Sequence, residues 1–102
     1  MQFILDEKEF FLRDKIQVLY FYAPWMPQHK KIVSMLSKME DIYQFEFIAI
    51  DVDYFKPFCK RFNITSIPEI IILDNGKELK RISGVILFSA MKNAFINLKK
   101  GD

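Results

Sequence analysis

Cysteine is nearly absent from this sequence, which contains one residue of that type, Cys59, among 102. A single thiol excludes an intramolecular disulfide, and it also excludes a metal site built from several thiolates. The small disulfide-stabilised scaffolds and the thiolate zinc proteins are therefore ruled out as classes. We expect no cofactor.

The sequence also lacks an excess of charge of one sign and a long apolar run. The sequence has 15 basic and 13 acidic residues, which give a net charge of +2 and are interspersed along the chain. Because nucleic-acid binding needs a clustered basic face, we expect no direct nucleic-acid contact. No apolar run approaches the roughly 20 residues of a membrane helix, and the first residues do not resemble a signal peptide. We therefore expect a cytoplasmic protein with no membrane segment.

The hydrophobic pattern predicts strands and helices in alternation along one domain, residues 1–102. Apolar runs predict strands at 2–5, 16–22, 45–51 and 69–73, and the turn signal at 74–76 predicts that 77–83 return as a hairpin partner. Asp6 is placed to N-cap a first helix of about eight residues. Apolar spacings of three and four predict further helices at about 27–43, across 55–62 and at about 87–99. The long helix has an apolar set of Ile32, Met35, Leu36, Met39, Ile42 and Tyr43. This order predicts an α/β fold whose partly parallel sheet ends in an antiparallel hairpin.

Four motifs follow one another along the chain. They are YFYAPW at 20–25, IDVD at 50–53, FNITSIPEIII at 62–72 and DNGKELKRISGV at 74–85. With these motifs the chain resembles the thioredoxin family over essentially its whole length. The resemblance implies a thioredoxin-like fold, with a mixed central sheet of four to five strands flanked by about four helices. It also implies that Pro68 is the family's cis-proline.

The departures from the family fall at its redox site. Aligned on the preceding Ala-x-Trp, Met26 and His29 occupy the positions of the two redox cysteines. Disulfide exchange needs one thiolate to attack and a second thiol to resolve the mixed disulfide, and neither a thioether nor an imidazole replaces them. Tyr20 matches the family's buried acid, and Ala49 matches the lysine that pairs with it. We therefore expect no dithiol–disulfide oxidoreductase activity, and we assign no catalytic residue.

Other chemistry at these positions stays open. Met26 and His29, three residues apart at a helix start, would suit a soft metal such as copper, although two ligands are few. His29 would act as a general base if Thr65 or Ser66 approached from the facing loop. Cys59, which the resemblance places on the far side of the usual site, is either a redox-sensing thiol or a small core residue, and its apolar neighbours favour the core.

Two carboxylates alternate at the end of the third predicted strand. Asp51 and Asp53 have the spacing of a paired acid site. A structural role explains them equally well, because Asp53 is placed to cap the next helix. We therefore expect no catalysis from this pair.

A protein-binding role does not depend on thiols. In thioredoxins the residue before the cis-proline offers its backbone N–H and C=O to an extended peptide, and the matching residue is Ile67. Beside it, residues 85–88 are four consecutive apolar residues, of which one helical turn cannot bury all. We expect the exposed ones to form an interface with Trp25. The predicted binding residues are Trp25, Met26, Pro27, His29, Val52, Ile67, Pro68, Gly84, Val85 and Phe88.

The sequence thus predicts a redox-inactive thioredoxin-like protein that acts as a protein-binding module or as a subunit of a larger complex. The expected partner is a protein or an extended peptide, bound beside the Trp25 motif and the Pro68 loop. One alternative is a thioredoxin-related enzyme or soft-metal-binding protein that uses Met26 and His29. Another is a holdase-type folding helper that binds unfolded chains, and the oligomeric state stays open.

Overall fold

The computed structural model describes residues 1–4, 6, 10, 12–96 and 98. Its elements follow the order strand, strand, helix, strand, helix, strand, strand, helix. They are β1 (Gln2–Phe3), β2 (Ile16–Tyr22), α1 (His29–Tyr43), β3 (Glu46–Asp51), α2 (Lys56–Arg61), β4 (Glu69–Asp74), β5 (Lys77–Ser83) and α3 (Phe88–Ile96).

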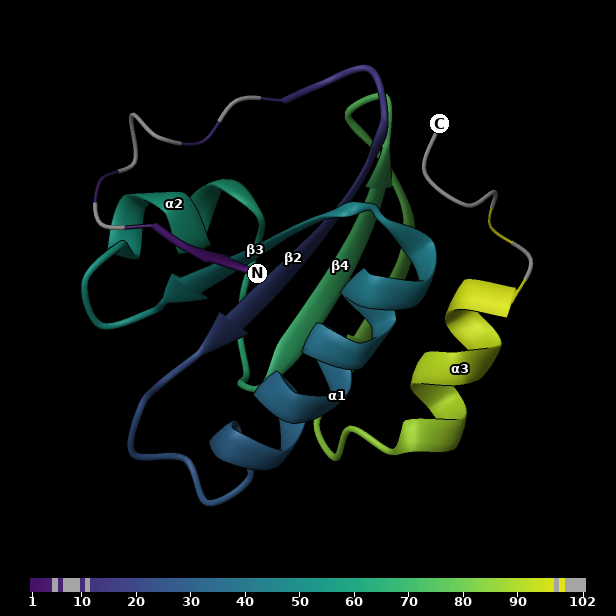
Figure 1. The fold of residues 1–102 in the computed structure, drawn as a ribbon. Coiled ribbons are helices and arrows are strands. Elements are labelled where there is room, and N and C mark those ends of the chain that lie inside the picture. Colours follow the sequence, from purple (N-terminus) through teal and green to yellow (C-terminus); the bar gives the residue numbers. More distant parts are fainter. Residues whose placement is uncertain (5, 7–9, 11, 97, 99–102) are drawn as a thin grey trace.

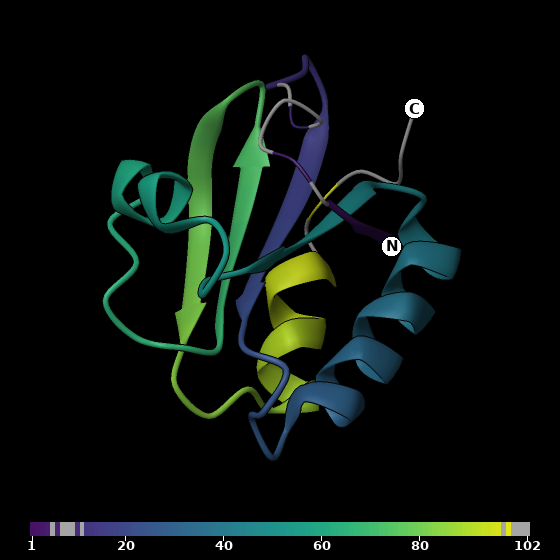
Figure 2. The same ribbon diagram turned by 90° about the vertical axis from the view of Figure 1, so that its left-hand side faces the viewer.

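The five strands form one mixed sheet in the order β1-β3-β2-β4-β5 (Figure 1). β3 runs parallel to both β1 and β2, whereas β4 runs antiparallel to β2 and to β5. Helices α1 and α3 cover one face of the sheet, and α2 covers the other (Figure 2). The predicted α/β class and the thioredoxin-like mixed sheet are confirmed.

Strand β2 divides the core into two layers. It is buried at every position after Ile16, as expected for a strand covered on both faces. Because successive side chains of a strand point to opposite faces, Val18, Tyr20 and Tyr22 pack toward α1 and α3. Leu19 and Phe21 point the other way, toward α2. Each tyrosine of β2 is thereby directed to the face on which α1 begins.

The observed elements differ from the predicted ones at a few ends. α1 begins at His29, two residues later than predicted, because residues 23–28 form turns in which Met26 N–H donates to the carbonyl oxygen of Ala23. Ile42, predicted among the core residues of α1, is exposed, since it lies about 70° around the helix from the middle of the buried stripe.

Part of the prediction lies beyond what the structure describes. Residues 5, 7–9 and 11, where the first strand ends and the helix after Asp6 is predicted, are outside the described residues, as are 97 and 99 in the last helix. Within the described part of the chain, no helix is long and apolar enough to span a membrane.

Candidate functional site

Three connections meet at one end of the sheet, the lower end in Figure 1. They are residues 23–28 between β2 and α1, the segment that leads into β4, and residues 84–87 between β5 and α3. The Ile67–Pro68 peptide bond is cis. Gly84 N–H donates to the carbonyl oxygen of Pro68 over 3.2 Å, which joins the second and third connections. The φ of +77° at Gly84 is a left-handed conformation that favours glycine.

His29 is held at the start of α1 by a stack of rings. Its imidazole lies 4.4 Å from the Tyr22 ring, measured between centroids, and the planes differ by 8°. Tyr22 in turn stacks on Tyr20, 5.2 Å away. The hydroxyl of Tyr20, a fully buried residue, is 3.0 Å from Nδ1 of His29. The structure therefore brings together the two residues aligned with the family's buried acid and second cysteine.

Burial keeps both members of this pair neutral. It raises the pKa of Tyr20, with a smaller contribution from Tyr22. It also lowers the pKa of His29, while the Asp51 carboxylate acts in the opposite direction. Between a neutral hydroxyl and a neutral imidazole one hydrogen bond forms, with Tyr20 as donor when the ring proton is on Nε2 and as acceptor when it is on Nδ1. The hydrogen bond orients the imidazole.

We expect the free energy of unfolding to fall as the pH is lowered from about 7.5 to about 5.5. The pKa of His29 is lower in the folded than in the unfolded chain, so the unfolded chain takes up a proton first. The contribution of His29 is fully present above the unfolded pKa of about 6.5 and is lost as the pH falls toward the folded pKa. His29 is the sole histidine, so His29→Phe should flatten this slope in urea titrations. A variant that kept the slope would contradict the assignment.

The carboxylates at the end of β3 are used by the turn that follows. Asp51 Oδ1 accepts from the Asp53 backbone N–H at 2.9 Å, and Asp53 Oδ2 accepts from Trp25 Nε1 at 3.3 Å. The N-cap of α2 is Phe55, without a side-chain cap. The prediction that Asp53 caps this helix is therefore wrong, because the Trp25 indole takes up its carboxylate instead.

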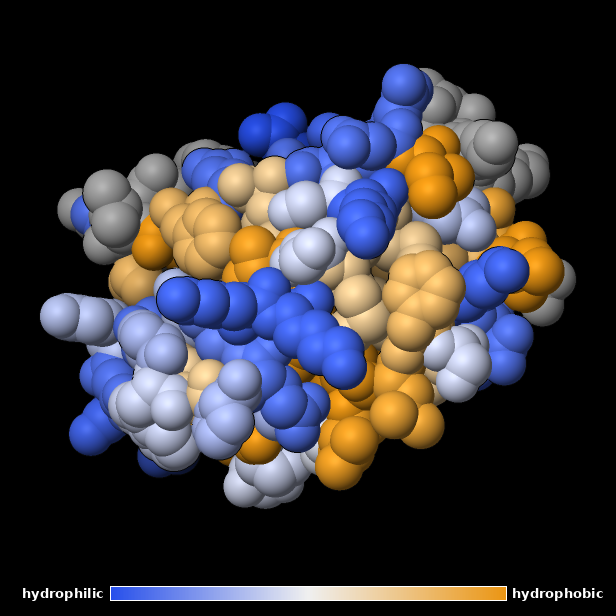
Figure 3. Space-filling view, turned by 60° about the horizontal axis from the view of Figure 1, so that its bottom comes forward, coloured by the Kyte–Doolittle hydropathy of each residue, from blue (hydrophilic) through white to orange (hydrophobic). Residues whose placement is uncertain are grey.

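The predicted binding residues divide by exposure. Trp25 is 71% exposed and Val85 is 69% exposed, and Leu87 and Phe88 are also exposed. We call Trp25, Val85, Leu87 and Phe88 the loop-end apolar set. Pro27 and Gly84 are exposed, His29, Val52 and Ile67 are half-buried, and Pro68 is buried. Figure 3, which brings this end of the molecule forward, shows orange apolar surface gathered below its centre.

Met26 and Ile86 belong to the core rather than to this surface. Met26 is 8% exposed and Ile86 is 5% exposed, and both lie in the layer under α1 and α3. Of the apolar run 85–88, only Ile86 is therefore buried. Met26, whose side chain was predicted to contact a partner, has little surface with which to do so.

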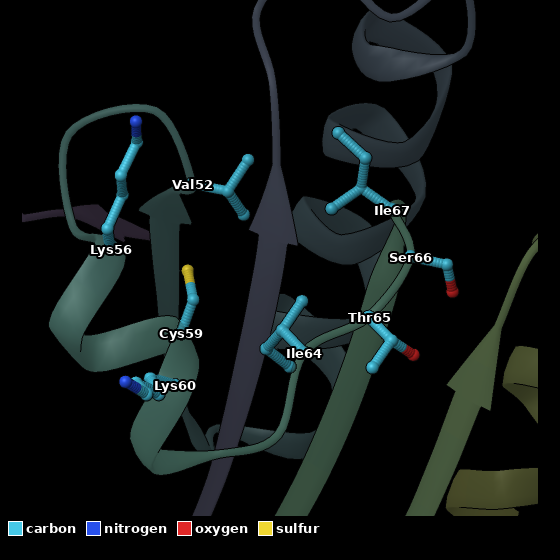
Figure 4. Close-up of a pocket in the computed structure, with 8 residues that line it drawn as sticks. All are labelled: Val52, Lys56, Cys59, Lys60, Ile64, Thr65, Ser66 and Ile67. Carbon is cyan, nitrogen blue, oxygen red and sulfur yellow. The ribbon is translucent and has the colours of Figure 1, made fainter.

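A pocket of about 430 Å³ opens between α2 and the segment before β4 (Figure 4). The predicted residues Val52 and Ile67 line it, together with Cys59. Cys59 belongs to α2, on the face of the sheet opposite α1, and its place on the far side of the family's site stays a prediction. The pocket also includes Lys56 and Lys60, which sequence reasoning missed. The sequence did hold a signal for them: Cys59 and Lys60 follow Lys56 by three and four residues, which places all three on one face of a helix.

No group of three or more histidine, cysteine, aspartate or glutamate side chains suited to a metal ion occurs among the described residues. His29 Nδ1 is already hydrogen-bonded to Tyr20, and Met26 is buried. Thr65 and Ser66, the other partners considered for His29, line the pocket beside α2.

The mixed sheet, the helices on its two faces and the cis-proline segment beside the start of α1 define a thioredoxin-like α/β protein. The family model described as Thioredoxin matches residues 4–97. This chain belongs to the thioredoxin family, so the resemblance drawn from its motifs is confirmed.

Thioredoxins are among the proteins that this chain resembles in sequence and structure. Thioredoxin-1 of Saccharomyces cerevisiae is 32% identical over 73 residues, which cover 71% of this chain and 71% of the relative. The thioredoxin of Mycoplasma genitalium is 29% identical over 91 residues, 88% of this chain and 89% of the relative. Among solved structures, the germline-specific thioredoxin Deadhead of Drosophila melanogaster matches with a TM-score of 0.76 at 28% identity, covering 83% of this chain and 82% of the other.

Proposed function

We propose that this protein is a thioredoxin-family member that carries out no dithiol–disulfide exchange and instead binds a protein partner at the loop end of its sheet. The observation that carries the proposal is the exposure of the loop-end apolar set around the cis-proline segment. Monomeric proteins rarely leave several large apolar side chains exposed close together unless another molecule covers them.

The residues in the place of the redox pair support the first half of the proposal. Met26 has no ionisable proton and is buried, and His29 is engaged by Tyr20. The one thiol in the sequence, that of Cys59, belongs to α2. A single thiol lacks the intramolecular resolving partner that turnover of a dithiol mechanism requires.

The backbone around Pro68 supports the second half. Within the described part of the chain, no backbone hydrogen bond to another residue engages the N–H or C=O of Ile67. An extended peptide adds to such a segment through main-chain hydrogen bonds and gains specificity from neighbouring side-chain pockets. Val52 and Gly84 flank this segment, and Trp25 supplies an exposed aromatic ring of the kind that dominates many interfaces.

We expect Trp25→Ala and Ile67→Asp to weaken partner capture by at least about 30-fold, the size of a typical interface hot spot. The wild-type protein would be immobilised, the captured partner identified and purified, and its affinity measured for each variant. Lys77→Ala, on an exposed position of β5 and outside the predicted binding residues, is the control and should change affinity little. Loss of capture on Lys77→Ala with retention on Trp25→Ala would contradict the proposal.

The same preparations separate binding from redox activity. Insulin reduction by dithiothreitol should be no faster with the wild-type protein than without it, because the protein lacks a second thiol. Clear turnover would overturn the redox-inactive half of the proposal and leave the binding half to the capture measurements.

A further inference from the structure

The pocket beside α2 joins the proposed peptide-binding segment to a basic helix. Val52 and Ile67 lie at its upper end, where their side chains face each other in Figure 4. Ile64 lies below both of them in this view, and the Cys59 sulfur points up toward Val52. These four side chains make an apolar interior that one large side chain of a ligand would fill.

Polar groups occupy the edges of this pocket. Lys56 and Lys60 stand on α2, and Thr65 and Ser66 lie on the opposite side, where Figure 4 shows their hydroxyls directed away from the apolar interior. A volume of about 430 Å³ is within the range of pockets that hold small ligands. An apolar interior with a polar edge suits a ligand that carries both kinds of group.

The charges that the described residues bring to the pocket have one sign. Among these residues no acidic side chain lines it, and neither Lys56 nor Lys60 forms an ion pair with another of them. Arg61 adds a third positive charge to a six-residue helix that carries no acid. Two ammonium groups beside an apolar pocket attract a carboxylate, most strongly at low ionic strength.

We propose that this pocket recognises an apolar side chain next to an acidic residue in an extended segment of the protein partner. The inference rests on the proposed function, because Ile67 belongs to both the pocket and the peptide-binding segment. In this arrangement the apolar side chain enters between Val52, Ile64 and Ile67, and the carboxylate lies at Lys56 and Lys60. A small inorganic anion would leave the apolar interior unused, so the chemistry fits a peptide.

Short fluorescein-labelled peptides with a central leucine test the proposal. They differ only in the two residues beside the leucine, which are glutamate, glutamine or lysine. The glutamate peptide should bind about tenfold more tightly than the lysine peptide, and added salt should reduce the difference. Lys56→Glu/Lys60→Glu should abolish this preference. Lys77→Glu/Lys80→Glu, on exposed positions of β5, changes the net charge equally and should preserve it.

Cys59 supplies a second measurement at the same place. It is the one cysteine of the chain, so N-ethylmaleimide modifies a single thiol, and the adduct occupies the pocket. Modification should abolish binding of the glutamate peptide in the wild-type protein. Binding that survives modification would overturn the proposal, because the peptide would then lie elsewhere.

The remaining outcomes separate this proposal from the one on which it rests. Three results would overturn recognition of an acidic segment. They are equal affinity for the three peptides, a preference lost equally in both double variants, and no peptide binding at all. The proposed function fails on a different result, namely partner capture that survives both Trp25→Ala and Ile67→Asp. The peptide measurements and the partner-capture measurements therefore fail on different results.

Discussion

Replacing Arg81 with alanine is expected to lower the free energy of unfolding by about 3 kcal/mol, because it leaves a buried carboxylate without its partner. Glu69 is 3% exposed, and its Oε1 accepts from Arg81 Nη1 at 2.8 Å. Its Oε2 has no hydrogen-bond partner among the described residues. Without the Arg81 guanidinium, the Glu69 carboxylate would therefore be a buried charge that has lost its ion-pair partner.

Arg81 also ties together segments that are distant in the sequence. Its Nη2 donates to the carbonyl oxygen of Phe62 at 2.9 Å and to Glu78 Oε1 at 2.7 Å. The two hydrogen bonds from Arg81 lower the pKa of the Glu78 carboxyl. Because Phe62 begins the segment that reaches Pro68, Arg81 anchors the approach to the proposed binding site.

The free energy of unfolding of Arg81→Ala, measured in urea, is compared with that of two further variants, which control for the loss of side-chain volume and of charge. Lys80→Ala, on the same strand and exposed, should change the free energy of unfolding by less than about 0.5 kcal/mol. The double variant Glu69→Met/Arg81→Met should recover most of the loss, since apolar residues replace a buried ion pair at little cost. An Arg81→Ala variant as stable as Lys80→Ala would show that Glu69 finds other compensation.

Phe95→Ala is expected to destabilise the protein by about 3–5 kcal/mol, through lost burial and the cavity left behind. Phe95 is fully buried, and its ring packs against rings of α1 and β3, edge-on to Tyr43 and tilted to Phe47. Its ring centroid lies 5.4 Å from that of Tyr43 and 5.8 Å from that of Phe47. A loss of this size is a large part of the stability of a typical domain, about 5–15 kcal/mol.

Phe88→Ala, on the same helix, is the matched control. Phe88 is 50% exposed, so its removal should change the free energy of unfolding by less than about 1 kcal/mol while weakening capture of the proposed partner. Thermal melts should separate the two variants widely, since each 1 kcal/mol corresponds to roughly 4–8 °C in a domain of this size. Equal melting temperatures would contradict the assignment of Phe95 to the core and Phe88 to the binding surface.

The elements were largely predictable because their signals are local. The runs 16–22 and 77–83 become β2 and β5 with the predicted bounds, since continuous apolar residues and a hairpin turn are properties of neighbours in the chain. The start of α1 was less predictable. Pro27 is compatible with a first helical turn, but the turn between Ala23 and Met26 delays the helix to His29.

The site was predictable only in part, because its contacts join residues far apart in the sequence. The motifs located Tyr20 and His29, yet nothing in their spacing specified a hydrogen bond between a β2 tyrosine and the first residue of α1. Likewise, the apolar run 85–88 predicted mixed exposure without showing that Ile86 is the member that packs inward. Such details depend on how a helix docks, which local periodicity does not encode.

Residue identities were enough to indicate the family and what its motif site lacks, since one thiol is present and Met26 and His29 stand where the family has cysteines. The burial of Met26, the hydrogen bond between Asp53 and Trp25, and the pocket that Cys59 shares with Val52 and Ile67 became apparent in the folded chain. Burial and contact arise from packing between distant segments, so the same side chain is core or surface according to what covers it.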